Sequence, residues 1–321
     1  MGGPLDALTI DGQFFRCAGE PWTAIESSDF SLFKRYLDGD DIAPVLEERR
    51  NVGFNLLRVW LLNKSVVGSR YAGDPSDDGI HPNQHPDFYM RLTAFVRLCA
   101  NYGLYAELTV FTQTKTLMPN RDDQQRHLDR TADAVRDEPN VLIELVNEND
   151  QHDNAVDPDL RRPLGVVISR GSNGADRKPP RHDDPWGYEL YHTNGLFEFQ
   201  RKVGHNAMEW AAQSGRPCIS NENTRYPDND SSETHAYDAA IGAALLCAGS
   251  CFHSQGGKFS RLFDDVERKC ATAWVAGAKS VPLEFQRGSY RHREEFESAN
   301  IIRAYSRTLG DGREYIIRIR K

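Results

Sequence analysis

The sequence has no surplus of positive charge and none of the short motifs that mark nucleotide, zinc or serine-nucleophile chemistry. Lys and Arg number 39 against 47 Asp and Glu, a net charge of −8 at pH 7. The electrostatic attraction that drives binding to a nucleic-acid backbone is therefore missing. No GxSxG, GxxxxGK[ST] or GxGxxG motif and no CxxC pair occurs. These absences argue against a serine hydrolase, a nucleotide-binding protein and a structural zinc site.

The composition also lacks the signatures of disordered and membrane proteins. Hydrophobic residues make up 39% and charged residues 27% of the 321 residues, which is enough apolar material for a core and too polar for a membrane protein. The start of the sequence has neither the charged nor the apolar region of a signal peptide, which favours an intracellular location. The six cysteines (Cys17, Cys99, Cys218, Cys247, Cys251 and Cys270) are widely spread and predict mostly buried thiols, although a Cys247–Cys251 disulfide stays open.

What the sequence does have is an alternation of short β-rich runs with apolar helical stretches. After a hairpin around Asp11-Gly12, this rhythm is typical of parallel β/α units. The predicted strands cover residues 16–20, 55–61, 104–111, 141–148, 164–169, 187–191, 216–220 and 248–253, and the predicted helices 41–51, 86–101, 124–136, 196–213, 235–246 and 263–276. Eight strands in about 300 residues predict a single-domain α/β protein, a (β/α)8 TIM barrel over residues 14–280 with an extension over 281–321.

Three segments depart from a regular barrel. Residues 150–163 are too polar and too rich in proline for the fourth helix, and residues 170–185 predict a long loop beside a cleft. Beyond the barrel, two β-rich runs flank Gly310-Asp311-Gly312 and predict a second hairpin, which we expect to close the bottom of the barrel beside the first.

Two predicted strands end in a glutamate between asparagines. The fourth ends in Asn147-Glu148-Asn149, and the seventh is followed by Asn221-Glu222-Asn223. Catalytic side chains of a β/α barrel come from the carboxyl ends of its strands. Glu148 and Glu222 are therefore the candidate catalytic pair.

The strand order of these residues resembles that of the clan A glycoside hydrolases, the barrel superfamily that includes the cellulase- and mannanase-like family 5. Ile143–Glu148 is similar to the clan's fourth-strand signature, in which the final Glu is the acid/base. The resemblance places the nucleophile at Glu222 and an arginine at Arg58, with an aromatic residue or histidine of the sixth strand at Tyr191 or His192. The sequence departs from the clan in having Phe252-His253-Ser254-Gln255 where a tryptophan is common.

The resemblance implies a retaining glycosidase that needs no cofactor or metal and acts on an oligo- or polysaccharide. One carboxylic acid protonates the leaving oxygen while a carboxylate attacks the sugar, so Glu148 is expected to have a raised pKa and Glu222 to be kept ionised by Arg58. Asn147 is expected to bind the sugar 2-hydroxyl, and His192 to position the pair. Further substrate-binding candidates are Trp22, Tyr191, His253 and Gln255, while Trp60 is more typical of a core residue.

Plainer interpretations remain open at this point. Arg58 can instead pair structurally with Glu107 or Glu144, and a lone histidine such as His192 often satisfies only a loop carbonyl. A lysine Schiff-base aldolase is disfavoured because no predicted strand ends in lysine. The remaining alternative is a non-catalytic glycan-binding protein built on the same barrel.

Overall fold

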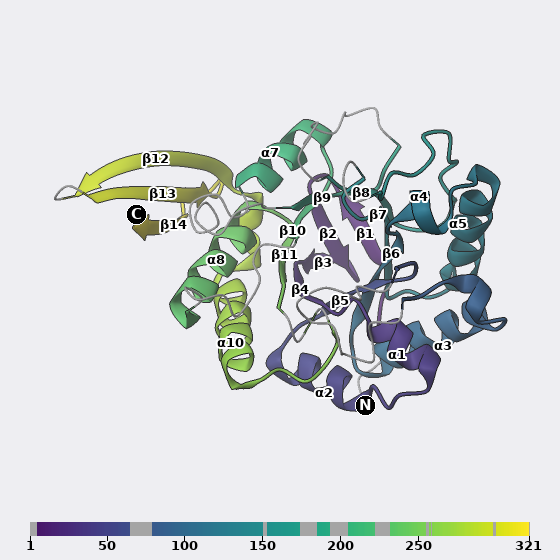
Figure 1. Cartoon of the computed structure of the whole chain (residues 1–321). Helices are drawn as coiled ribbons and strands as arrows, with labels where there is room; N and C mark the ends of the chain where they lie inside the picture. The colour runs from purple at the N-terminus through teal and green to yellow at the C-terminus, as the bar shows by residue number, and fades with distance from the viewer. Residues whose placement is uncertain are drawn as a thin grey trace.

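The fold, taken from a computed structural model, is a closed barrel of eight parallel strands (Figure 1). The structure describes residues 5–64, 79–149, 153–173, 185–192, 205–221, 232–254, 257, 259–297 and 300–320. The barrel strands, in chain order, are β4 (Ala24–Ser28), β5 (Leu56–Trp60), β6 (Tyr105–Phe111), β7 (Val141–Val146), β8 (Ile168–Asn173), β9 (Tyr188–His192), β10 (Cys218–Asn221) and β11 (Gly249–Phe252). Each strand pairs in parallel with the next, and β11 closes the ring on β4. The predicted TIM barrel is confirmed.

Helices surround the barrel, as Figure 1 shows. They are α1 (Leu32–Asp38), α2 (Ala43–Val52), α3 (Phe88–Asn101), α4 (Thr114–Leu117), α5 (Arg121–Val135), α7 (His205–Ser214), α8 (Glu233–Leu246) and α10 (Asp265–Ser280), with short 3-10 turns η2 (Pro82–Gln84) and η3 (Leu283–Arg287). In α3 the buried residues Phe88, Leu92, Phe95, Val96 and Cys99 recur every three or four positions, the pattern that turns one helix face to a core. Asp264 begins α10 with a reciprocal capping box to Glu267.

A three-stranded antiparallel sheet covers the amino-terminal end of the barrel. It consists of β1 (Leu8–Asp11), β2 (Phe14–Cys17) and β3 (Glu20–Trp22), and its Leu8 and Phe15 pack with the lowest inward side chains of the barrel strands. The predicted hairpin is confirmed, but residues 16–20 are not the first barrel strand. That strand is β4, whose sequence AIESS includes three polar residues, all of them completely buried.

The outer layer is incomplete between β7 and β8. Residues 153–167 contain no helix, as the prolines and polar residues of this segment predict. The strand that follows is Ile168–Asn173, four residues later than expected, and part of the predicted loop 170–185 therefore belongs to the barrel. Residues 174–184 lie outside the described residues.

The carboxyl-terminal extension forms a second antiparallel sheet of three strands, β12 (Ser289–Glu297), β13 (Asn300–Thr308) and β14 (Glu314–Arg320). Its last two strands are the predicted hairpin. Tyr305 and Ile317 pack into the same cluster as α8, and the Arg307 guanidinium donates hydrogen bonds to the carbonyls of Leu245 and Leu246. The sheet therefore lies outside the barrel, against α8 (Figure 1), and does not close the bottom beside the first hairpin.

The cysteines match the expectation of mostly buried thiols. All six cysteines are free, five of them buried and Cys17 half-buried, so Cys247 and Cys251 form no disulfide. Among the described residues, no helix is both long and apolar enough to cross a membrane.

Candidate active site

Glu148 lies immediately beyond the carboxyl end of β7, in a backbone conformation that most residues avoid. Its φ is +44°, in the left-handed region that costs a non-glycine residue free energy. The Ser172 hydroxyl of β8 accepts a hydrogen bond from the Glu148 amide at 3.0 Å, and Asn154 donates to the Glu148 carbonyl at 3.4 Å. Contacts on both sides thus hold the turn that carries this carboxyl group, whose side chain is 15% exposed.

His192, the last residue of β9, lies beside Glu148. The His192 Nδ1 atom is 3.4 Å from Glu148 Oε1, and the imidazole is almost fully buried. In register, His192 is the neighbour of Asn221, the last residue of β10. The structure therefore brings the predicted positioning histidine to the predicted acid/base, at the rim where β9 and β10 end.

Arg58 of β5 lies inside the barrel and is fully buried. Its Nε donates to Glu144 Oε2 at 2.8 Å and its Nη2 lies 2.7 Å from the same oxygen, whereas the nearest approach to Glu107, from Nε to Oε2, is 3.6 Å. The structural ion pair that the sequence left open is therefore formed. Arg58 also reaches the site, because Nη2 donates to Asn147 Oδ1 at 2.8 Å.

This contact fixes the orientation of Asn147. A guanidinium has only N–H donors, so the amide atom that faces Arg58 must be the oxygen. The Ser172 hydroxyl approaches the same oxygen at 3.5 Å. The Asn147 NH2 group consequently points away from Arg58 and is the part of the side chain left to donate to a ligand.

Arg58 is outnumbered by carboxyl groups inside the barrel. Glu26 of β4, Glu107 of β6 and Glu144 of β7 are all fully buried, and they share this one guanidinium. Burial raises the pKa of Glu26 to about 7 against the opposing charge of Arg58. Burial and the charges of Glu26 and Glu144 raise the pKa of Glu107 well above its ordinary value. The sequence suggested that Glu107 and Glu144 point inward, but Glu26 was missed because its strand was not recognised.

The opposite side of the mouth is formed by the ends of β11 and β4. His253 Nδ1 lies 3.0 Å from the Ser28 hydroxyl, which in turn lies 3.1 Å from the Cys251 thiol. His253 also lies beside the Phe30 ring, with centroids 5.3 Å apart. Phe30, which sequence reasoning missed, stacks on Trp60 at 4.0 Å with nearly parallel rings. Trp60 is half-buried in this stack and is not wholly a core residue.

Two predicted substrate-binding residues lie away from this mouth. Tyr191 points outward from β9, packs against Trp210 of α7 with centroids 5.0 Å apart, and accepts a hydrogen bond from Asn206. Trp22 packs edge-on against Phe15 and Tyr105 in the layer that covers the amino-terminal end of the barrel. Successive side chains of a strand point to opposite faces, so Tyr191 points outward because its neighbour His192 points into the barrel.

Glu222 and Gln255 lie outside the described residues. The residue before Glu222 is Asn221, which is completely buried at the end of β10, the seventh barrel strand. Among the described residues, no group of three or more His, Cys, Asp or Glu side chains is arranged to hold a metal ion.

Comparison with known proteins gives a match at the level of structure alone. No family model and no curated protein matches the sequence. A family 5 mannosidase from Rhizomucor miehei superposes with a TM-score of 0.58 at 12% identity, covering 85% of this chain and 98% of that one. A structure described as a glycoside hydrolase gives 0.60 at 11%, covering 99% and 93%. The barrel is similar to those of family 5 glycoside hydrolases.

Two of the similar structures contain sugars. A GH5_18 protein from Bifidobacterium longum, in complex with Manβ1-4GlcNAc, has a TM-score of 0.54 at 13% identity and covers 80% of this chain and 78% of that one. The Rhizomucor mannosidase is also described in complex with mannosyl-fructose. At identities this low the similarity establishes a shared fold, the TIM barrel, and nothing finer.

Proposed function

We propose that the protein is a retaining glycoside hydrolase acting on a β-linked glycan, with Glu148 as the acid/base and Glu222 as the nucleophile. The observation that carries the proposal is the end of β7, where Glu148 sits in a strained turn and Asn147 is oriented by Arg58. Strained residues held by their surroundings are concentrated at functional sites. Glu222 follows Asn221 in the sequence, and Asn221 ends the seventh strand, whose carboxyl end lies on the same rim of the barrel as that of β7.

In the proposed mechanism, Glu222 attacks the anomeric carbon while protonated Glu148 donates its proton to the leaving oxygen, and the ionised Glu148 then activates the water that releases the sugar. The Asn147 NH2 group donates a hydrogen bond to the sugar 2-hydroxyl, an interaction that strengthens in the transition state. His192 orients Glu148 through their contact. His253 and the half-buried Trp60 line the same mouth and contact the sugar, and the proposal needs no cofactor.

The similar structures guide the choice of substrate. Because they include mannosidases and a complex with a β-mannosyl disaccharide, we propose a β-mannoside as the first substrate to test. The experiment compares wild type with the Glu148→Gln/Glu222→Gln double variant on aryl β-mannosides, β-glucosides and a panel of β-linked polysaccharides, measuring released aglycone and reducing ends. Activity in the wild type alone supports the proposal.

Single variants test the two roles. Glu222→Ala is expected to abolish turnover and to regain part of it with azide, which attacks from the opposite face and yields a glycosyl azide of inverted configuration. Glu148→Ala is expected to spare substrates with activated leaving groups, which need no protonation. Equal losses without azide rescue contradict the assignment. A folded wild type that binds glycans without cleaving any of them indicates a glycan-binding protein.

A further inference from the structure

Among the described residues, the interior of the barrel holds more carboxyl groups than cations. Three carboxyl groups surround Arg58: Glu26, Glu107 and Glu144. The other titratable groups that face them are the Tyr188 hydroxyl from β9 and the Cys251 thiol from β11, while β8 contributes the Ser172 hydroxyl. Three ionised carboxylates in this volume would leave two negative charges buried without compensation, which is strongly unfavourable.

The hydrogen bonds show which of these three carboxyl groups pairs with Arg58 as a carboxylate. Both Glu144 oxygens accept short contacts: Oε2 from Arg58 Nε at 2.8 Å and Thr109 at 2.5 Å, and Oε1 from the Ser172 hydroxyl at 2.9 Å. Glu107 is the direct register neighbour of Arg58 on the adjacent strand, and yet Arg58 Nε stays 3.6 Å from its Oε2. A neighbouring carboxylate with a full charge is expected to draw the guanidinium closer than this.

Glu107 and Glu26 are instead arranged as a pair. Glu107 Oε1 accepts a hydrogen bond from the Tyr188 hydroxyl at 2.7 Å. Among the described residues, neither Glu107 Oε2 nor the Glu26 oxygens accept a hydrogen bond from an amine, amide or hydroxyl group. The groups that influence the pKa values of these two carboxyls include each other and, for Glu26, the Cys251 thiol. Two buried carboxyl groups that influence each other and lack other donors are stabilised when one of them carries a proton and donates it to the other.

We propose that Glu107 is a permanently neutral carboxylic acid that donates its proton to Glu26, so that Arg58 stays committed to Glu144 and holds Asn147 beside Glu148. Glu107 and Glu26 then act as positioning residues, because neither touches Glu148 and both act through Arg58. The raised pKa values of both carboxyl groups agree with this arrangement. The positioning role rests on the proposed function, whereas the protonation state of Glu107 does not.

Glutamine supplies a close mimic of the proposed neutral acid. In Glu107→Gln the amide oxygen can accept from Tyr188 and the amide N–H can donate to Glu26, so kcat/KM on an aryl β-mannoside is expected to stay within about threefold of wild type. Glu144→Gln removes the ion that orients Arg58 and is expected to lower kcat roughly 10- to 100-fold, the usual loss when a residue that orients a functional group is removed. Glu107→Leu, which can neither accept nor donate, is expected to lose activity like Glu144→Gln.

A spectroscopic measurement tests the protonation state whether or not the protein is an enzyme. At mildly alkaline pH, infrared spectra of the wild type are expected to show the C=O stretch of a neutral carboxylic acid, and this band is expected to vanish in Glu107→Gln and to persist in Glu26→Gln. Absence of the band in the wild type, or its persistence in Glu107→Gln, overturns the proposal. So does a loss of activity in Glu107→Gln as large as that in Glu107→Leu. If no substrate is found, the infrared result decides the protonation state alone and the failure belongs to the proposed function.

Discussion

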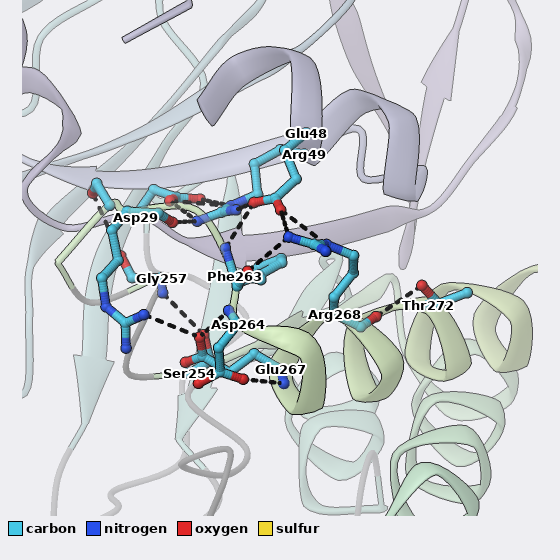
Figure 2. Close-up of polar contacts among 12 residues, drawn as sticks. Asp29, Glu48, Arg49, Ser254, Gly257, Phe263, Asp264, Glu267, Arg268 and Thr272 are labelled. Carbon is cyan, nitrogen blue, oxygen red and sulfur yellow. Dashed lines mark hydrogen bonds and ion pairs between the residues drawn. The ribbon is translucent and has the colours of Figure 1, made fainter. Parts of the chain in front are cut away.

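Arg49 and Arg58 are both completely shielded from solvent, but one lies outside the barrel and the other inside it. Arg49 of α2 donates to Asp29 through Nη2 at 3.0 Å and to the Arg261 carbonyl at 2.7 Å, and its guanidinium lies 3.6 Å above the Phe263 ring. Figure 2 shows Arg49 and Asp29 within a network of polar contacts that joins α2, the end of β4 and the start of α10. Around Arg49 each charged group has a matched partner.

The Arg58 centre differs because its charges are not matched one to one. It has more carboxyl groups than guanidinium groups, so at least one carboxyl group must be protonated. The Arg58 guanidinium also donates one of its N–H groups to a neutral amide, that of Asn147. A buried pair with all donors satisfied fixes the packing of three elements, as at Arg49. A buried centre with more carboxyl groups than cations can instead use its arginine to orient a functional side chain. The Arg49 centre therefore stabilises packing, whereas the Arg58 centre orients Asn147.

Breaking the matched pair is expected to have the largest effect. Asp29→Ala removes the fully buried carboxylate that pairs with Arg49 and leaves it, among the described residues, only Glu48 as an acidic partner, so the free energy of unfolding is expected to fall by ~3 kcal/mol, the lower end of the range for a broken buried pair, measured by urea denaturation. The folded fraction should keep the kcat of the wild type. A suitable control is Arg313→Ala, because Arg313 pairs with Glu284 and Asp311 on the surface and should leave the melting temperature unchanged. A lower kcat in folded Asp29→Ala would make the Arg49 centre part of the active site.

Replacing Arg58 or Arg49 by lysine should show that the first residue affects activity and the second only stability. An ammonium group cannot reproduce the planar fork that contacts Glu144 and Asn147 together. Arg58→Lys is therefore expected to lower kcat/KM roughly 10- to 100-fold, as for other residues that orient functional groups. Arg49→Lys should lower stability and spare the kcat of the folded protein. Equal effects on activity from both substitutions would show that the centres do not differ in the way described.

Much of this architecture is readable from the sequence because it depends on local pattern. Alternating apolar strands and helices predict the barrel, and the polar, proline-containing segment before β8 predicts the missing helix. β4 escapes such reasoning because its inward residues Glu26 and Ser28 are polar. Their burial is made possible by Arg58 of the next strand, β5, and by Cys251 and His253 at the end of β11, far along the chain.

The site is only partly readable for the same reason. A glutamate at a strand end identifies Glu148, because strand ends meet at one rim of a barrel. Proximity to a strand end does not identify a ligand-binding aromatic, since adjacent residues face opposite sides. Tyr191 and Trp22 illustrate this, one packed under α7 and the other in the covering layer. Phe30 lies beyond the strand that was not recognised, so no local pattern marked it.

A third buried polar residue, His127 of α5, extends the comparison to a site without any ion. Its Nδ1 shares a hydrogen bond with the Tyr89 hydroxyl at 2.8 Å, and burial lowers its pKa from 6.5 to about 3. Below pH 6.5 the His127 imidazole is therefore protonated in the unfolded chain but stays neutral in the folded protein, so the free energy of unfolding falls as the pH drops toward 3. Glu26 acts in the opposite direction: its pKa rises from 4.5 to about 7 on folding, so the folded protein takes up a proton first and stability increases as the pH drops from 7 to 4.5.

Between pH 4.5 and 6.5 these two contributions oppose each other, each with a limiting slope of ~1.4 kcal/mol per pH unit. Replacing His127 or Glu26 should therefore leave the pH dependence caused by the remaining residue visible. Relative to wild type, His127→Gln is expected to gain stability as the pH is lowered across this window, and Glu26→Gln is expected to lose it, with free energies of unfolding measured by urea titration at each pH. Carboxyl groups away from the two sites titrate equally in all three proteins, and Glu107, whose pKa lies well above its ordinary value, is expected to stay protonated across this window, so the difference between slopes isolates the two sites. Parallel slopes in the three proteins would contradict the shifted pKa values of both His127 and Glu26, and Glu26 would then not take up a proton near neutral pH inside the Arg58 centre.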